Sequence, residues 1–132
     1  IESRMDIVNV PTAPAHIKGI IRLHGEIVPV FCLATRFGLQ DRPVENMIVA
    51  NVNGMKVALE VEKVKEIVDV DNSRVLPMPI LMNGVKNCFN DVASCQKELI
   101  VMLDVNSLVS LEEQQQIRKL IDDSGKAKEE QK

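Results

Sequence analysis

Two histidines and three cysteines supply the side chains of this chain that could act as bases, nucleophiles or metal ligands. His24 stands at a predicted turn and could reach Cys32 across it, which would pair an imidazole with a thiol. Cys32, however, lies in an apolar stretch, and no third group that would orient the histidine is evident. We therefore expect no catalysis, and a small thiol-dependent enzyme built on Cys32 and His24 is a remote alternative.

Metal and cofactor chemistry also lack support in the sequence. Cys88 and Cys95 are the closest pair of potential ligands, and no second pair accompanies them, whereas zinc sites are built from clustered ligands. The glycines are scattered, and none begins a phosphate loop between a strand and a helix. We expect reduced thiols of a cytosolic protein, no metal and no cofactor.

The carboxylates form no recognisable catalytic pair. Their spacing near the predicted strands matches no acid–base arrangement, and carboxylates on strand faces are usually solvated. The residues concerned are Asp6, Glu26, Glu62, Glu66 and Asp69. The chemistry of this chain is therefore expected to lie in its surfaces and strand edges, which favours the binding of other proteins.

Composition limits the class of partner. The chain has 132 residues, a formal net charge of −3 and 2% aromatic residues, with no Trp or Tyr. This composition lacks the basic face and the stacking surfaces that nucleic-acid-binding proteins use. No stretch reaches the roughly 18 apolar residues of a membrane helix, and the first residues do not resemble a secretory leader. We expect a soluble, cytoplasmic domain without membrane insertion.

Residues 17–33 predict a hairpin. Apolar and polar residues alternate along its first arm, as expected of a half-buried strand. Gly25 can take the positive φ of a two-residue turn, placed at either His24-Gly25 or Gly25-Glu26. Pro29 cannot donate a hydrogen bond, so the second arm is expected to lie at a sheet edge or to carry a bulge at that point.

The rest of the chain continues a mainly β pattern. Asn53-Gly54 separates two alternating stretches and predicts a second hairpin over residues 47–61. A short helical or irregular turn that ends at Gly38 is expected within residues 34–43, and residues 86–95 are ambiguous. Strands are expected at residues 5–10, 64–70 and 98–105, the last one buried because its apolar run is continuous, and an extended or looping segment at residues 73–84.

The C-terminal part predicts a helix. Ser110 and Glu113 form a capping box, after a residue, Asp104, that can cap a short turn. Leu111, Ile117, Leu120 and Ile121 are expected along one side of the helix. Residues 122–132 are charged and are expected to form a flexible tail, which leaves a domain over residues 1–121. Short strands followed by one helix favour an all-β barrel architecture.

The residue pattern resembles that of the CheW-like chemotaxis coupling domain family. Residues 17–39, IKGIIRLHGEIVPVFCLATRFGL, are similar to the family signature: an apolar-x-Gly strand, an Asn-Leu-Arg-Gly turn, an apolar-Val-Pro strand and a Leu-x-x-x-Phe-Gly segment. The similarity continues at residues 57–70, 77–79 and 98–110, so that it covers most of residues 5–115.

This resemblance implies a mainly β fold of two small SH3-like β-barrel subdomains and a role without catalysis. Family members act in bacterial chemotaxis as adaptors that join the cytoplasmic tip of a chemoreceptor, a methyl-accepting chemotaxis protein, to the regulatory domain of the histidine kinase CheA. The nearer alternative is the same module within a CheV-type or CheA protein. Coupling by binding alone requires different affinities for the signalling states.

The resemblance also implies a set of partner-binding residues, which line the receptor groove of the family. His24 departs from the arginine of most members and lacks its permanently charged, bidentate guanidinium, which implies a receptor contact that is weaker, pH-sensitive or altered in partner choice. Met47, Val64 and Ile67 are about equally expected to pack in the core, because strands alternate faces. The full set is Asp6, Gly19, His24, Gly25, Met47, Val64 and Ile67.

Family members usually have two further strands before the segment that matches Ile1. The resemblance therefore implies that one barrel of this chain is open. An open barrel exposes a strand edge that can pair with another chain. If the upstream strands are truly absent, we expect self-association through exposed strand edges.

Overall fold

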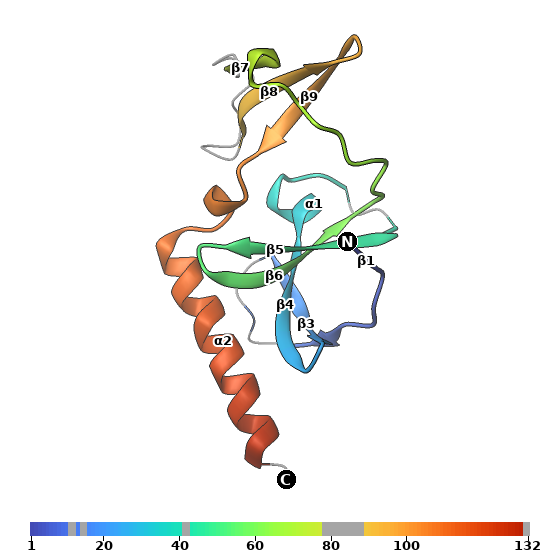
Figure 1. Ribbon diagram of the computed structural model, residues 1–132. Coiled ribbons are helices and arrows are strands. Elements are labelled where there is room, and N and C mark those ends of the chain that lie inside the picture. Colours follow the sequence, from blue (N-terminus) through green and yellow to red (C-terminus); the bar gives the residue numbers. More distant parts are fainter. Residues whose placement is uncertain (11–12, 14–15, 41–42, 78–88, 131–132) are drawn as a thin grey trace. The chain divides into compact units, whose positions relative to one another are not determined.

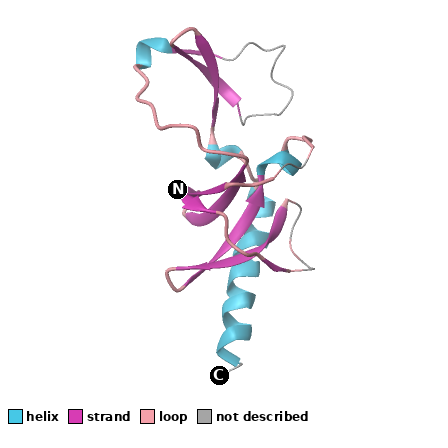
Figure 2. Cartoon of the chain, turned by 90° about the vertical axis from the view of Figure 1, so that its right-hand side faces the viewer, coloured by secondary structure: helices cyan, strands magenta, loops and turns pink. Residues whose placement is uncertain are grey.

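The computed structural model describes residues 1–10, 13, 16–40, 43–77 and 89–130, apart from the side chains of Asn90 and residues 124–130. The chain divides into two compact units, one of residues 1–64 and 109–132 and the other of residues 65–108. The first unit holds a six-stranded sheet and the C-terminal helix, and the second a three-stranded sheet (Figures 1 and 2). The mainly β fold with a C-terminal helix is thereby confirmed.

The sheet of the first unit is built from the two predicted hairpins. β3 (Ile17–Leu23) pairs with β4 (Glu26–Cys32), and β5 (Asn46–Val52) pairs with β6 (Met55–Val61). Parallel pairing of β4 with β6 joins the hairpins, and the short strands β1 (Glu2–Ser3) and β2 (Val8–Asn9) complete the order β1-β5-β6-β4-β3-β2. The strand predicted at residues 5–10 is thus limited to β2.

Both hairpin turns have the predicted residues in the left-handed conformation. His24 and Gly25 have φ values of 50° and 81°, and Asn53 and Gly54 have values of 50° and 85°. Positive φ at both central residues is the requirement of a type I′ turn, whose twist matches that of the flanking strands. The first hairpin therefore turns at His24-Gly25, the first of the two alternatives.

Pro29 does not place β4 at a sheet edge, and no register shift occurs at that residue, so both predictions for it are wrong. Leu23 pairs with Glu26 next to the turn, and hydrogen-bonded pairs alternate from there. Pro29 falls at a pair without hydrogen bonds, where its nitrogen points away from β3. Pairing of β4 with β6 begins only at Val30, so the Pro29 nitrogen is not required as a hydrogen-bond donor to β6 either.

Both faces of β4 are buried. Val28 and Val30 lie on one face, in a core cluster that also contains Ile21, Leu23, Met47 and Ala58. Phe31, only 1% exposed, lies on the opposite face. The helix α2 (Leu111–Glu130) contacts β4 (Figure 1). A core on each side of this strand explains why the second hairpin arm is apolar throughout.

The predicted capping box begins α2. The Ser110 hydroxyl accepts a hydrogen bond from the Glu113 amide, and the Glu113 carboxylate accepts one from the Ser110 amide, both at 3.1 Å. Ile117 and Leu120 are buried as predicted, but Leu111 is 77% exposed because it lies about 240° around the helix from Ile117. The helix continues to Glu130, and the flexibility of residues 122–132 stays a prediction.

The second unit holds the three-stranded sheet β7-β8-β9. Its strands are β7 (Val75–Pro77), β8 (Phe89–Cys95) and β9 (Glu98–Leu103), flanked by the 3₁₀ helices η1 (Asn72–Arg74) and η3 (Val105–Ser107). Asp104 caps η3, since its carboxylate accepts a hydrogen bond from the Asn106 amide at 3.2 Å. Within the predicted segment 73–84, residues 73–77 lie in η1 and β7. Residues 78–84 and Cys88 lie outside the described residues.

Two expectations for this part of the chain are wrong. Residues 64–70 form no strand, and Ile67 and Val68 are 83% and 44% exposed. Their apolar residues do not alternate strictly, and no neighbouring strand pairs with them in the described part of the chain. β9 is a strand as predicted, but its residues Glu98 to Met102 are exposed rather than buried.

The segment after β4 forms a single helical turn. α1 (Leu33–Arg36) is followed by its C-cap residue Phe37, and Gly38 has φ of 68°, as its predicted role as terminator requires. Neither helix within the described residues combines the length and apolar character needed to cross a bilayer.

Candidate functional site

The turn of the first hairpin presents charged side chains to solvent. His24 and Gly25 are exposed, and the neighbouring Glu26 accepts a hydrogen bond from the Lys56 ammonium at 2.6 Å. This hydrogen bond and the charge of Lys56 lower the pKa of Glu26 below its usual 4.5, with a smaller contribution from His24. The turn is therefore accessible and polar, and the Glu26–Lys56 ion pair next to it links β4 to β6.

Gly19 serves the packing of β2 on β3. A Cβ atom added to Gly19 would lie 2.1 Å from the Val8 carbonyl oxygen and 2.8 Å from a methyl carbon of Ile7. Because such distances are excluded sterically, only glycine allows β2 to approach this closely. Gly19 is buried and shapes the strand pairing beneath the surface.

Met47, like Gly19, has a structural role inside the first unit. Its side chain is fully buried in the core cluster of the first unit. Of the two expectations for this residue, core packing is the one that its burial supports. Val64 is half-buried, and its amide donates a hydrogen bond to the Asn46 side chain at 3.1 Å.

Asp6 lies in a polar pocket of the first unit. The pocket has a volume of about 310 Å³. Asp6 is exposed, and three further charged residues contribute to the lining. The lining residues are Arg4, Met5, Asp6, Ile7, Lys18, Pro43, Val44 and Glu60.

Glu60 is the buried charged residue of this region. Only 5% of its side chain is exposed, and the Lys18 ammonium lies 2.8 Å from its Oε1 atom. The β3–β4 register skips Lys18 between Ile17 and Gly19, so Lys18 is the extra residue of a bulge. Bulges redirect side chains, and here the redirected ammonium reaches across β4 to β6. No aligned hydrogen-bond donor to Oε1 occurs among the described residues.

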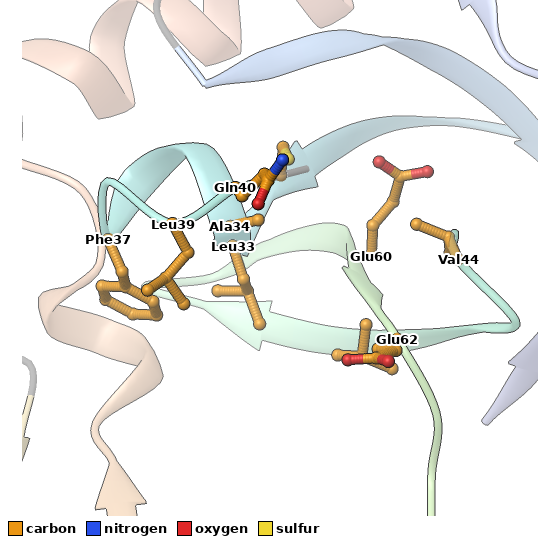
Figure 3. Close-up of a pocket in the computed structure, with 10 residues that line it drawn as sticks. Leu33, Ala34, Phe37, Leu39, Gln40, Val44, Glu60 and Glu62 are labelled. Carbon is orange, nitrogen blue, oxygen red and sulfur yellow. The ribbon is translucent and has the colours of Figure 1, made fainter. Parts of the chain in front are cut away.

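Glu60 also borders a second, more apolar pocket of about 470 Å³ (Figure 3). Leu33, Phe37 and Leu39 gather at one end of this pocket, and Glu60 and Val44 stand at the other. The remaining lining residues are Cys32, Ala34, Gln40, Val61 and Glu62. The lining therefore combines apolar walls with the two carboxylates of Glu60 and Glu62.

Cys32 and His24 do not form a thiol–imidazole pair. Cys32 is the last residue of β4 and His24 lies in the turn before its first residue, so the length of the strand, about 20 Å at the usual rise, separates them. Cys32 is 3% exposed and accepts a hydrogen bond from the Thr35 hydroxyl at 3.1 Å. Cys32 and Cys95 are free thiols. The geometry therefore does not support the thiol-dependent enzyme.

Within the ranges that the structure describes, no group of three or more His, Cys, Asp or Glu side chains could hold a metal ion.

The predicted partner-binding residues thus fall into different settings. Asp6, His24 and Gly25 are exposed on the first unit, whereas Gly19 and Met47 are buried in it. Ile67 belongs to the second unit, where it is highly exposed.

The Lys18–Glu60 pair was missed from the sequence. Alternation in residues 57–61 indicates that Val57, Leu59 and Val61 face inward and that Glu60 faces solvent. Both faces of β6 are in fact buried, so alternation could not reveal a buried carboxylate. The one available signal was the placement of Glu60 in an otherwise apolar run.

A family comparison identifies the domain type. The model of the CheW-like domain family matches residues 1–113 of this chain.

Individual relatives agree with this match. The chain is 25% identical to the chemotaxis protein CheW of Treponema pallidum over 123 residues, which covers 87% of this chain and 72% of the relative. It is 29% identical to the probable chemotaxis protein CheW of Rhizobium etli over 104 residues, or 76% and 67% of the two chains.

A solved structure supports the fold as well. The crystal structure of the scaffolding protein TtCheW from Thermoanaerobacter tengcongensis matches with a TM-score of 0.71 and 27% identity, covering 86% of this chain and 81% of that one.

Proposed function

This chain belongs to the CheW-like domain family, and on that premise we propose that it is a non-enzymatic adaptor of a chemotaxis array in the cytoplasm. It binds the cytoplasmic tips of chemoreceptors and the regulatory domain of CheA, and it couples the state of one to the activity of the other. The observation that carries the proposal is the family match over residues 1–113. The similarity to proteins named as chemotaxis and scaffolding proteins supports it.

The accessible residues of the proposed receptor site are expected to make direct contacts. Ile67, with 83% of its surface exposed, offers apolar area that a partner can bury. Asp6 and the His24-Gly25 turn offer polar contacts on the first unit. Gly19 and Met47 are buried, and their expected contribution is indirect, through strand pairing and core packing.

Neither alternative gains support from the structure. The similar chemotaxis proteins are named CheW, which favours the free-standing adaptor over the module of a CheV-type or CheA protein. The thiol-dependent enzyme would need Cys32 beside His24, but Cys32 ends β4 and His24 lies in the turn before that strand. We further propose that the adaptor associates with itself through exposed strand edges.

Calorimetric titration of the chain with a chemoreceptor tip and with the CheA regulatory domain tests the adaptor role. We expect binding of both, with dissociation constants of roughly micromolar order, as is common for transient signalling contacts. Absence of binding to both partners would overturn the proposal.

Ile67→Glu tests the receptor site within the same titration. The substitution is expected to weaken receptor binding at least about tenfold, because it places a charge in a desolvated contact. The matched control is Leu111→Glu, which changes another highly exposed apolar residue at the start of α2. Equal affinities of the two variants would exclude Ile67 from the site.

A further inference from the structure

The polar pocket of the first unit is lined by two carboxylates and two cations, of which one carboxylate is buried. Asp6 and Arg4 are exposed, and the Lys18 and Glu60 side chains are 35% and 5% exposed. Glu60 is therefore shielded from a partner that binds at the surface, although it lines the same pocket as the proposed receptor-site residue Asp6. An effect of Glu60 on binding has to pass through its neighbours.

Lys18 is the neighbour through which Glu60 can act. The Lys18 ammonium lies 2.8 Å from the Glu60 Oε1 atom. The bulge between Ile17 and Gly19 directs Lys18 toward this pocket, whose lining also includes Asp6. Lysine carries its charge on a long, flexible stem, so its ammonium can turn from one carboxylate to another nearby. Asp6 and Glu60 thus compete for the same ammonium.

Burial decides this competition in favour of Glu60. A buried carboxylate that loses its counter-charge is costly, whereas an exposed carboxylate is stabilised by water. An ion pair with the exposed Asp6 is therefore worth less than one with Glu60. The pairing of Lys18 with Glu60 leaves the charge of Asp6 available at the surface.

We propose that Glu60 is a positioning residue of the receptor site, which holds Lys18 away from Asp6 so that Asp6 binds a basic side chain of the receptor tip. This inference rests on the proposed function and adds the chemistry of the contact at Asp6. A carboxylate binds lysine or arginine through charge-assisted hydrogen bonds. An ammonium at Asp6 would repel the basic side chain and occupy the acceptor oxygens, so the Lys18–Glu60 pair favours partners that are basic at this point.

Arg4 is the second cation of the pocket and stays the same in every comparison. Its side chain is exposed, and its amide donates a hydrogen bond to the Glu45 carbonyl oxygen at 3.2 Å. The charge of Arg4 is present in each variant below, so differences between the variants report on Lys18, Glu60 and Asp6.

A double-mutant cycle tests the role of Glu60. Calorimetric titration with a chemoreceptor tip gives the dissociation constants of the wild-type chain, Asp6→Asn, Glu60→Gln and the double variant. Asp6→Asn should weaken binding about fivefold, because it removes the carboxylate from an exposed ion pair. Glu60→Gln should weaken it about threefold, because Lys18 then turns to Asp6. The double variant should bind no more weakly than Asp6→Asn, since both changes act on one contact.

Two further variants separate positioning from a loss of folding. Lys18→Met/Glu60→Gln removes the released ammonium and should restore the affinity of the wild-type chain. Glu112→Gln, which removes an exposed carboxylate in the first turn of α2, is the matched control and should leave the affinity unchanged. Circular dichroism shows whether each chain is folded at the temperature of the titration. Damage to folding by Glu60→Gln would add to the effect of Asp6→Asn.

NMR spectroscopy follows Lys18 without any receptor. Nuclear Overhauser effects between the Lys18 ε-methylene and the Asp6 β-methylene protons should be stronger in Glu60→Gln than in the wild-type chain. Unchanged effects in Glu60→Gln, full additivity of Asp6→Asn and Glu60→Gln, or receptor binding by Glu60→Gln as tight as by the wild-type chain would each overturn the proposal.

The two proposals fail in different ways. A wild-type chain that binds no receptor tip overturns the adaptor role, and the contact at Asp6 with it. A chain that binds the tip with the same affinity in all four forms of the cycle overturns only the inference about Glu60 and Asp6.

Discussion

Glu60 carries its carboxylate into the interior of the first unit, where Lys18 is its ion-pair partner at 2.8 Å. Removing one member of a fully buried pair costs about 3–5 kcal/mol, because the other charge is left without compensation. A third of the Lys18 side chain is exposed, at 35%, so water screens part of the loss. We expect Lys18→Met to lower the free energy of unfolding by about 2 kcal/mol.

Urea denaturation measures this difference, and a double variant provides its control. Lys18→Met/Glu60→Leu removes both charges and should recover most of the lost stability, because apolar residues can replace a buried ion pair. If the double variant is no more stable than Lys18→Met, the cost does not arise from the uncompensated carboxylate.

His24 should limit the strength of receptor binding. The family resemblance implies an arginine at this turn, and histidine lacks its permanently charged, bidentate guanidinium. The charged groups nearby are Glu26 and Lys56. We expect His24→Arg to raise the affinity for a receptor tip roughly two- to fivefold. Titration calorimetry measures the affinity, and an unchanged value would contradict the prediction.

His24→Asn provides the matched control for this test. It replaces the imidazole with a side chain that carries no charge, so it should not raise the receptor affinity above that of the wild-type chain. A gain in His24→Asn equal to that in His24→Arg would show that the charge of arginine is not the cause.

Glu26 allows a direct test of the charge pair at the same turn. Its pKa lies below 4.5 in the folded chain because of Lys56, so its stabilising effect is present above pH 4.5 and is lost as pH falls through the folded-state pKa. NMR titration of the Glu26 carboxyl carbon should show the lowered pKa. In Lys56→Met the pKa should rise toward 4.5, and an unchanged value would contradict the role of Lys56.

At the scale of elements, local signals predicted the structure well. The turn dipeptides His24-Gly25 and Asn53-Gly54 predicted both hairpins, because positive φ at consecutive residues restricts the choice of residue strongly. The reciprocal bonds of Ser110 and Glu113 made the start of α2 predictable in the same way.

Features that depend on neighbouring elements were not predictable. Burial of β9 was inferred from its apolar run, but burial depends on what lies beside and above a strand. The interior place of β4 depends on its pairing with β6, which is distant in sequence. Residues 64–70 have strand-forming side chains but no described strand beside them.

The turn between β8 and β9 escaped prediction for a different reason. Gln96 and Lys97 have φ values of 47° and 69°, the conformation of a type I′ turn, without the glycine that usually permits it. Replacing them with Asn-Gly should relieve this strain and stabilise the hairpin by about 1 kcal/mol. Hydrogen exchange of the β8 and β9 amides measures the effect.

A reverse exchange provides the matched control for this turn. Asn53-Gly54 replaced by Gln-Lys should lower the protection of β5 and β6 by a similar amount, because the same strain is introduced there. Unchanged protection in both variants would show that the left-handed conformation costs little in this chain.

At the scale of the whole molecule, the family and the mainly β fold could be predicted, but the setting of the site residues could not. The resemblance identified His24-Gly25 and Ile67, which are exposed, together with Gly19 and Met47, which are buried. A sequence pattern proposes positions and does not distinguish an exposed residue from a buried one. That distinction required the pairing of β2 with β3 and the composition of the core.

The central claim is that one chain joins two partners by binding alone. It is tested most directly by immobilising a chemoreceptor tip and measuring how much CheA regulatory domain is retained with and without this chain. The account predicts that retention of the CheA domain depends on the chain, increases with its concentration to saturation and falls with Ile67→Glu. Retention that is the same in the absence of the chain, or no retention at any concentration of it, would contradict the account.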